Sequence, residues 1–217
     1  MSDLNSARQH MIDGQLRPNE VNDERIIGAI ESVNREKFVP KSLSGVAYLD
    51  EDIQVAPGRS LMEPMIFARL VDAAHIKKTD VVLDVACATG YSSAVLGRLA
   101  EAVVALEEDK TLAEIATTVL STEACDNVAV VTGALRDGLA EQGPYDVIFI
   151  NGMIDEIPAS LTDQIADGGR LICVLNQNGV GKAAYVTSEN GVVAKRILFD
   201  AAVTELAAFK KPEKFVF

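Results

Sequence analysis

The chain has 217 residues, of which 48% are hydrophobic, and a formal net charge of −12 at pH 7. This length indicates one domain, and the acidic balance argues against binding nucleic acid or an anionic membrane surface, because both require a basic face. No run approaches the ~18 apolar residues of a membrane span, and the polar N-terminus lacks a signal-peptide core, so we expect a cytoplasmic protein.

The cysteines and histidines do not form a pattern that indicates a metal site. Three cysteines, Cys87, Cys125 and Cys173, are scattered along the chain, and the two histidines are isolated from each other. Scattered cysteines are typical of reduced thiols in a cytosolic enzyme. We therefore expect no metal, and the sequence does not specify an oligomeric state.

The first third of the chain predicts a cap of helices and loops, over residues 1–78. Apolar residues at helical spacing predict a helix over 3–16 and another over 24–33, the second capped by Asn22 or Asp23. Residues 41–63 are punctuated by glycine and proline and are expected to be irregular, with solvated acids at 50–52. Pro64 suits the first position of a helix that runs to residue 74.

From residue 80 onward the pattern alternates between short apolar strands and helices, which indicates a parallel sheet. The last two strands flank Asn190-Gly191, a strong hairpin signal. We therefore predict an α/β fold: a Rossmann-like, doubly wound, mostly parallel sheet with an antiparallel C-terminal hairpin, over 79–217. The predicted strands are 81–85, 103–107, 128–132, 145–150, 170–175, 183–188 and 194–199, and the predicted helices are 91–99, 110–120 and 157–165.

The stretch VVLDVACATGYSSAVL, residues 81–96, predicts a strand, a tight turn and a helix, an arrangement typical of nucleoside-cofactor sites. Asp84 begins the turn, and Glu107 ends the next apolar run, where an acid can bind the two hydroxyls of a ribose. Ala86 and Ala88 crowd the position of a pyrophosphate, so the turn favours S-adenosylmethionine over a dinucleotide. Ordinary packing of a strand, turn and helix is the alternative.

Several longer motifs carry a resemblance to a known family. They are REKFVP at 35–40, the stretch GRSLMEP at 58–64, the turn at 84–96, and GGRL at 168–171. With these motifs the chain resembles class I S-adenosylmethionine-dependent methyltransferases, and more narrowly the protein-L-isoaspartate (D-aspartate) O-methyltransferase family. The resemblance implies S-adenosylmethionine as cofactor, S-adenosylhomocysteine as product, and carboxylates of damaged aspartyl residues in proteins or peptides as acceptors.

The chain departs from the family where the resemblance places the acceptor and the adenine. The family usually reads Gly-Gln-Thr-Ile-Ser-Gln-Pro where this chain has residues 58–64, so the active-site serine falls on Met62 and the threonine on Ser60. After the third predicted strand the family's Gly-Asp-Gly becomes Gly133-Ala134-Leu135. The acid expected near the adenine is therefore missing unless Asp137 replaces it.

The resemblance implies a set of site residues. Methyl transfer to a carboxylate needs alignment more than acid–base chemistry, and Arg59 is expected either to pair with the acceptor carboxylate or to be an ordinary surface arginine. The expected catalytic residues are Ser60, Arg59 and Met62, and the expected cofactor-binding residues are Asp84, Ala86, Cys87, Ala88, Gly90, Glu107, Glu108, Ala134 and Leu135.

Two other functions remain open on the sequence alone. The changes at Met62 and Leu135 are also compatible with a cofactor-binding family member that has lost isoaspartyl activity and acts as a sensor or adaptor, or on another acceptor. A nicotinamide oxidoreductase ranks lower, because Ala86 and Ala88 crowd a pyrophosphate.

Overall fold

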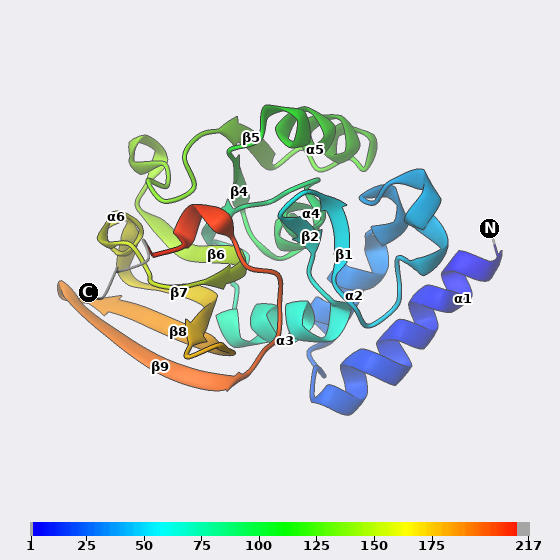
Figure 1. Ribbon diagram of the computed structural model, residues 1–217, viewed down its shortest axis with the longest axis horizontal. Helices are drawn as coiled ribbons and strands as arrows, with labels where there is room; N and C mark the ends of the chain where they lie inside the picture. Colours follow the sequence, from blue (N-terminus) through cyan, green and yellow to red (C-terminus); the bar gives the residue numbers. More distant parts are fainter. Residues whose placement is uncertain (1, 212–217) are drawn as a thin grey trace, which may run out of the picture.

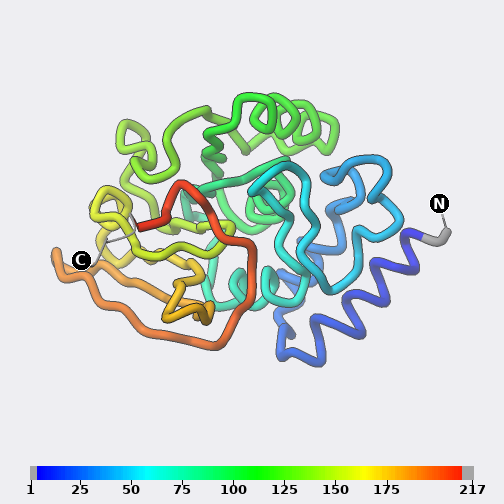
Figure 2. Tube along the Cα trace, in the orientation of Figure 1, coloured from blue at the N-terminus to red at the C-terminus, as the bar shows by residue number. Residues whose placement is uncertain are grey.

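An N-terminal cap packs beside an α/β core in the computed structural model, which describes residues 2–211 (Figures 1 and 2). The helices are α1 Ser2–Met11, α2 Glu24–Ser32, α3 Pro64–Ala74, α4 Tyr91–Leu99, α5 Lys110–Thr122 and α6 Ala159–Thr162. The strands are β1 Ile53–Ala56, β2 Arg59–Leu61, β3 Val81–Val85, β4 Ala102–Glu107, β5 Val128–Thr132, β6 Tyr145–Ile154, β7 Ile165–Gln177, β8 Val180–Glu189 and β9 Val192–Asp200.

The main sheet within residues 2–211 has the strand order β5-β4-β3-β6-β7-β8-β9. The strands from β5 to β7 are parallel, and the hairpin β8–β9 adds antiparallel strands at one edge. The predicted Rossmann-like fold is thus confirmed. The strand order reverses at β3, since β4 lies on one side and β6 on the other, and ligands of such folds bind at the carboxyl ends of the strands there.

Both faces of this sheet are covered, which explains its nearly continuous apolar strands. Along β3, Val82 belongs to the hydrophobic cluster that includes α3, α4 and the cap, whereas Leu83 belongs to the cluster on the opposite face. That second cluster is completed by Leu161 of α6 and by Leu206 and Phe209, which follow the last strand. Side chains that alternate between the faces therefore fix the register of the strands.

Residues 41–63 are more ordered than their punctuation predicts. β1 and β2 form an antiparallel hairpin outside the main sheet, paired from Ile53 with Leu61 to Ala56 with Arg59. The expectation that the acids at 50–52 are solvated is wrong for Asp52. Its carboxylate accepts hydrogen bonds from the backbone N–H of Glu63 and from the N–H and hydroxyl of Thr204, at 2.7–2.8 Å.

The helix predicted over 157–165 is the other departure from the predicted elements. α6 covers Ala159–Thr162 alone, and Ile165 already belongs to β7, where it pairs with Tyr145 of β6. Sheet pairing thus overrides the local helical pattern at the end of this segment. The other predicted strands and helices are present, with shifts of up to five residues at their ends, and the predicted helix over 3–16 continues after α1 as a π-helix over Ile12–Leu16.

The cap and the sheet share one hydrophobic cluster, which includes Met11 and Leu16 of the cap and Val82 of β3. The division between 1–78 and 79–217 therefore stays a prediction, and its terminal residues, 1 and 212–217, lie outside the described part of the chain. None of the helices in residues 2–211 has the length and apolar character needed to cross a membrane.

Candidate active site

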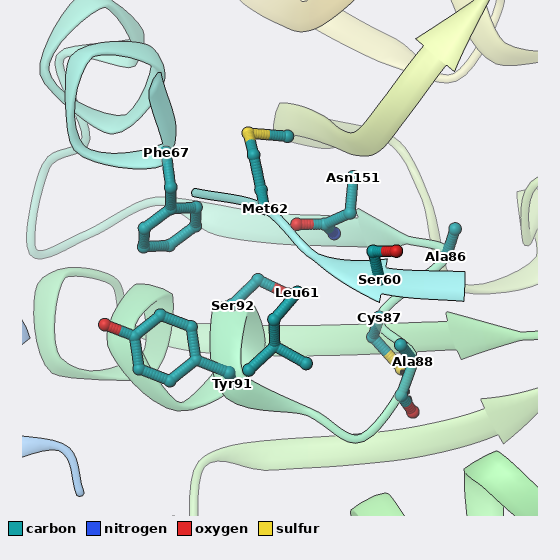
Figure 3. Close-up of a pocket in the computed structure, with 10 residues that line it drawn as sticks. All are labelled: Ser60, Leu61, Met62, Phe67, Ala86, Cys87, Ala88, Tyr91, Ser92 and Asn151. Carbon is teal, nitrogen blue, oxygen red and sulfur yellow. Dashed lines mark hydrogen bonds between the residues drawn. The ribbon is translucent and has the colours of Figure 1, made fainter. Parts of the chain in front are cut away.

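A narrow crevice lies at the carboxyl ends of β3 and β6, where the strand order reverses (Figure 3). Its volume of about 10 Å³ is close to the smallest that can hold one water molecule. The side chains around it come from the β2 segment, α3, the turn after β3, α4 and β6. They are Ser60, Leu61, Met62, Phe67, Ala86, Cys87, Ala88, Tyr91, Ser92 and Asn151.

The turn between β3 and α4 has the backbone that its small residues predict. Ala86, Ala88 and Gly90 all adopt left-handed conformations, with φ of 61°, 50° and 95°. Such a conformation costs an L-residue with a Cβ atom roughly 1–2 kcal/mol. The N–H groups of Ala86 and Cys87 both donate to the carbonyl of Leu106, so the turn is tied to the end of β4. The alanines thus keep the shape that glycines would adopt more easily.

Asp84 is buried behind the crevice and does not line it. Its carboxylate accepts hydrogen bonds from the hydroxyls of Ser92 and Ser93, at 2.7 and 2.5 Å, and from the amide of Asn151 at 2.6 Å. Burial raises the pKa of Asp84 to about 6, although these hydrogen bonds act in the opposite direction. Asp84 therefore connects β3 to α4 and to β6, and these hydrogen bonds hold the turn between β3 and α4 in position.

Glu107 ends β4 and has no exposed surface. One carboxylate oxygen accepts from the N–H groups of Glu108 and Asp109 at 2.9 and 3.1 Å, and the other accepts from the N–H of Ala88 at 3.0 Å. Ala88 itself lines the crevice. The acid predicted to bind a ribose thus lies beside the turn, as the sequence pattern requires.

Arg59 of β2 forms a buried ion pair with Glu107. Its Nε lies 3.2 and 3.4 Å from the two carboxylate oxygens of Glu107, and its Nη2 donates to Glu108 at 2.5 Å. The residue is 7% exposed, so the alternative of an ordinary surface arginine is wrong. The carboxylates that it contacts belong to this chain, and pairing of Arg59 with an acceptor stays a prediction.

Met62 and Ser60, from the segment that departs from the family, line the crevice together with residues of the turn (Figure 3). The backbone carbonyl of Met62 accepts a hydrogen bond of 2.7 Å from Nη2 of Arg35, whose Nε donates to the carbonyl of Ala47 at 2.7 Å. Arg35 is fully buried, its guanidinium lies 4.6 Å from the ring centroid of Tyr91, and its Nη1 has no hydrogen-bond partner within residues 2–211. Arg35 therefore fixes the backbone of the loop that covers the crevice.

The remaining predicted cofactor residues lie outside the crevice lining. Leu135 is buried in the cluster on the opposite face of the sheet, whereas Ala134 and Asp137 are exposed. A Cβ atom at Gly90 would meet Leu120 and Ala116 of α5. Among the predicted residues, the structure therefore brings together Ser60, Met62, Ala86, Cys87 and Ala88 around the crevice, with Arg59, Glu107 and Glu108 adjoining them.

Cys87 lines the crevice but has the properties of a small apolar residue. It is 3% exposed, and burial raises the pKa of its thiol well above the usual value. A thiol that stays protonated is a poor nucleophile. Cys87 therefore contributes to the crevice as a small apolar side chain in its wall and not as a nucleophile.

Arg35, Tyr91 and Asn151 were not among the predicted site residues. Arg35 and Tyr91 lie in segments that the resemblance had marked, the first in REKFVP and the second at the start of the helix after the turn. Asn151 follows the apolar part of β6 and donates to Asp84 and to the carbonyl of Val85. A polar residue directly after the predicted strand 145–150, beside the switch point, was the available signal.

Comparison with known sequences identifies the relatives of this chain. The sequence profile of the family "Protein-L-isoaspartate(D-aspartate) O-methyltransferase (PCMT)" matches residues 6–203. The protein-L-isoaspartate O-methyltransferase of Koribacter versatilis is 38% identical over 193 residues, which are 89% of this chain and 86% of that protein. The enzyme of the same name from Methanoculleus marisnigri is 34% identical over 165 residues, or 76% of this chain and 75% of its own.

Solved structures show the same fold. A protein-L-isoaspartate O-methyltransferase superposes with a TM-score of 0.80 at 24% identity, covering 91% of this chain and 65% of that chain. A Plasmodium falciparum protein assigned to the same enzyme class, in complex with S-adenosyl-L-homocysteine, has a TM-score of 0.78 at 19% identity, covering 94% and 98%. At these identities the two structures support the fold of the chain.

Proposed function

This chain belongs to the protein-L-isoaspartate (D-aspartate) O-methyltransferase family, and from that membership we propose that the crevice between β2, β3 and β6 is its site of methyl transfer. The protein is an S-adenosylmethionine-dependent methyltransferase whose acceptor is the carboxylate of isoaspartyl residues. The match covers nearly the whole chain, so the alternative of a sensor or adaptor is not favoured. We propose proteins and peptides with such residues as its substrates.

Methyl transfer to a carboxylate requires little acid–base catalysis by the protein. Bound S-adenosylmethionine would supply a methyl group, activated by its sulfonium, for transfer to an acceptor carboxylate oxygen, with S-adenosylhomocysteine as the other product. The carboxylate is already an anion, so alignment and exclusion of water are the tasks of this chain's residues. Apolar lining from Leu61, Met62 and Phe67 fits the second task.

The residues beside the crevice fit this cofactor in their chemistry. Glu107, at the end of β4, would hold the ribose hydroxyls, and the left-handed turn at Ala86 and Ala88 would lie against the methionine part. Two features make the fit tight. The alanine Cβ atoms narrow the approach to the turn, and Arg59 contacts Glu107 from the β2 side.

The single observation that carries the assignment of the crevice is the position of the 58–63 loop. Ser60 and Met62 of this loop line the same crevice as Ala86–Ala88, so acceptor and cofactor residues meet there. A hydroxyl at position 62 could hold an acceptor carboxylate, whereas the thioether of Met62 can only pack. We therefore propose that Met62 slows turnover without removing it.

The test is the initial rate of tritiated methyl transfer to an isoaspartyl peptide, with its normal aspartyl twin as the substrate control. We expect slow methylation of the isoaspartyl peptide alone by the wild type. Met62→Ser, and Met62→Ser with Ser60→Thr, should raise the rate by on the order of tenfold to a hundredfold, the scale of a ~1 Å change in alignment. Met65→Ser, outside the crevice lining, is the matched control. Fast wild-type turnover that neither variant changes would contradict a limiting role for Met62.

A further inference from the structure

Arg59 contacts the acid that the proposed function assigns to the cofactor. The side chain of Glu107 is fully buried and that of Arg59 is 8% exposed, so the ion pair is shielded from water. The guanidinium also donates to Glu108, whose side chain is 40% exposed, and to the carbonyl of Gly58 at 3.0 Å. Arg59 thus connects the β1–β2 hairpin to the end of β4.

The donors around Glu107 leave little room for two further hydroxyl groups. One oxygen accepts from the N–H groups of Glu108 and Asp109 and from Nε of Arg59, and the other accepts from the N–H of Ala88 and more distantly from the same Nε. A carboxylate has about four lone-pair sites in all. Four donors already occupy these sites, so a ribose hydroxyl can bind Glu107 only if at least one of the present donors leaves.

Arg59 is the donor best able to leave. The N–H groups of Glu108 and Asp109 belong to the turn into α5, which Asp109 caps through the N–H groups of Thr111 and Leu112. The N–H of Ala88 belongs to the turn tied to β4. Arg59, in contrast, is a flexible side chain on a hairpin that pairs with itself outside the main sheet. After leaving Glu107 it keeps a charged partner at the surface in Glu108.

We propose that Arg59 is an affinity-determining residue that competes with the cofactor ribose for Glu107 and holds the β1–β2 hairpin closed when no cofactor is bound. This inference rests on the proposed function, because it takes Glu107 as the ribose ligand. The apparent affinity of a site equals its intrinsic affinity multiplied by the fraction of molecules in the binding-competent state. If Arg59 is away from Glu107 in about one molecule in ten or fewer, the cofactor binds at least about tenfold more weakly than the open site allows.

The test is isothermal titration calorimetry of the full chain with S-adenosylhomocysteine, comparing the wild type with Arg59→Gln. Glutamine removes the charge, keeps an amide donor, and is the residue that the family usually carries at this position. We expect Arg59→Gln to bind about tenfold more tightly or better, and Arg59→Lys, which keeps the charge with a compact ammonium group, to bind with intermediate affinity. Arg69→Gln on α3, which contacts the ring of Phe199, is the control for the change in net charge and should bind like the wild type.

The outcomes separate this inference from the proposed function. Equal or weaker binding by Arg59→Gln and Arg59→Lys, while the wild type binds, overturns the competition and leaves the proposed function intact. A lack of binding by every variant overturns both. Arg59→Lys keeps the inference testable if Arg59→Gln does not fold. The melting temperature of each ligand-free variant reports the lost ion pair without using activity, and we expect it to be lower for Arg59→Gln than for Arg59→Lys.

Discussion

Replacing Asp84 with asparagine should make the protein more stable at neutral pH. Burial raises the pKa of Asp84 to about 6 in the folded chain, whereas an unfolded aspartate titrates near 3.9. Between these two values the folded state binds more protons than the unfolded state, so the free energy of unfolding falls as the pH rises from about 4 to about 6. A difference of about 2 pKa units corresponds to about 3 kcal/mol of lost stability above that window.

The asparagine would keep most of the surrounding hydrogen bonds. Its carbonyl oxygen can accept from Asn151, and its amide can donate to the hydroxyls of Ser92 and Ser93, because a hydroxyl can also accept. We therefore expect Asp84→Asn to be more stable than the wild type by about 1–3 kcal/mol at pH 8, with the hydrogen-bond rearrangement offsetting part of the gain. The difference should shrink toward pH 4.

The assay is urea unfolding of both proteins at pH 4, 5, 6, 7 and 8, with the free energy taken from linear extrapolation. Asp163→Asn is the matched control, because Asp163 is exposed and surface substitutions usually change stability by less than about 0.5 kcal/mol. A variant that is less stable than the wild type at pH 8 would refute the reasoning. It would show that the hydrogen bonds from Ser92, Ser93 and Asn151 outweigh the burial of the charge.

Two further substitutions test the frame of the site. Gly90→Ala should lower the free energy of unfolding, measured by urea unfolding, by about 1–2 kcal/mol, because an alanine there would keep φ near 95° and its Cβ would lie 3.0 Å from a methyl group of Leu120. An unchanged free energy would show that α5 shifts freely. Arg35→Met should lower it by about 2–5 kcal/mol, since the carbonyls of Ala47 and Met62 lose their buried donor; a loss below 1 kcal/mol would show that other donors replace the guanidinium.

The strands and helices near the site follow from local sequence signals. β3 and α4 have the predicted bounds, and α3 begins at Pro64 and ends at Ala74 as predicted. Apolar spacing and a proline at the first helical position act over a few residues, so they can be read without the rest of the chain. The turn at 86–90 and the acid at the end of β4 could likewise be predicted from neighbouring residues alone.

The partners of the charged residues could not be predicted from local sequence signals, because each partner lies far from its charged residue along the chain. Arg59 was expected to meet an acceptor or water, yet the fold brings it to Glu107, 48 residues away. Asp52 was expected to be solvated, yet it accepts hydrogen bonds from Thr204, 152 residues away. A charged side chain is compatible with many partners, and its neighbours in sequence do not select among them.

The alternation of strands and helices after residue 80, the doubly wound sheet and the turn at its switch point could be predicted from the sequence, because hydrophobic periodicity and backbone preference are local. Three features could be seen in the folded chain alone: Ile165 joins β7, Arg35 donates to the carbonyl of Met62, and Arg59 pairs with Glu107. These contacts depend on which strands become neighbours and on which charges the packing shields from water. That is a property of the whole chain rather than of any short stretch within it.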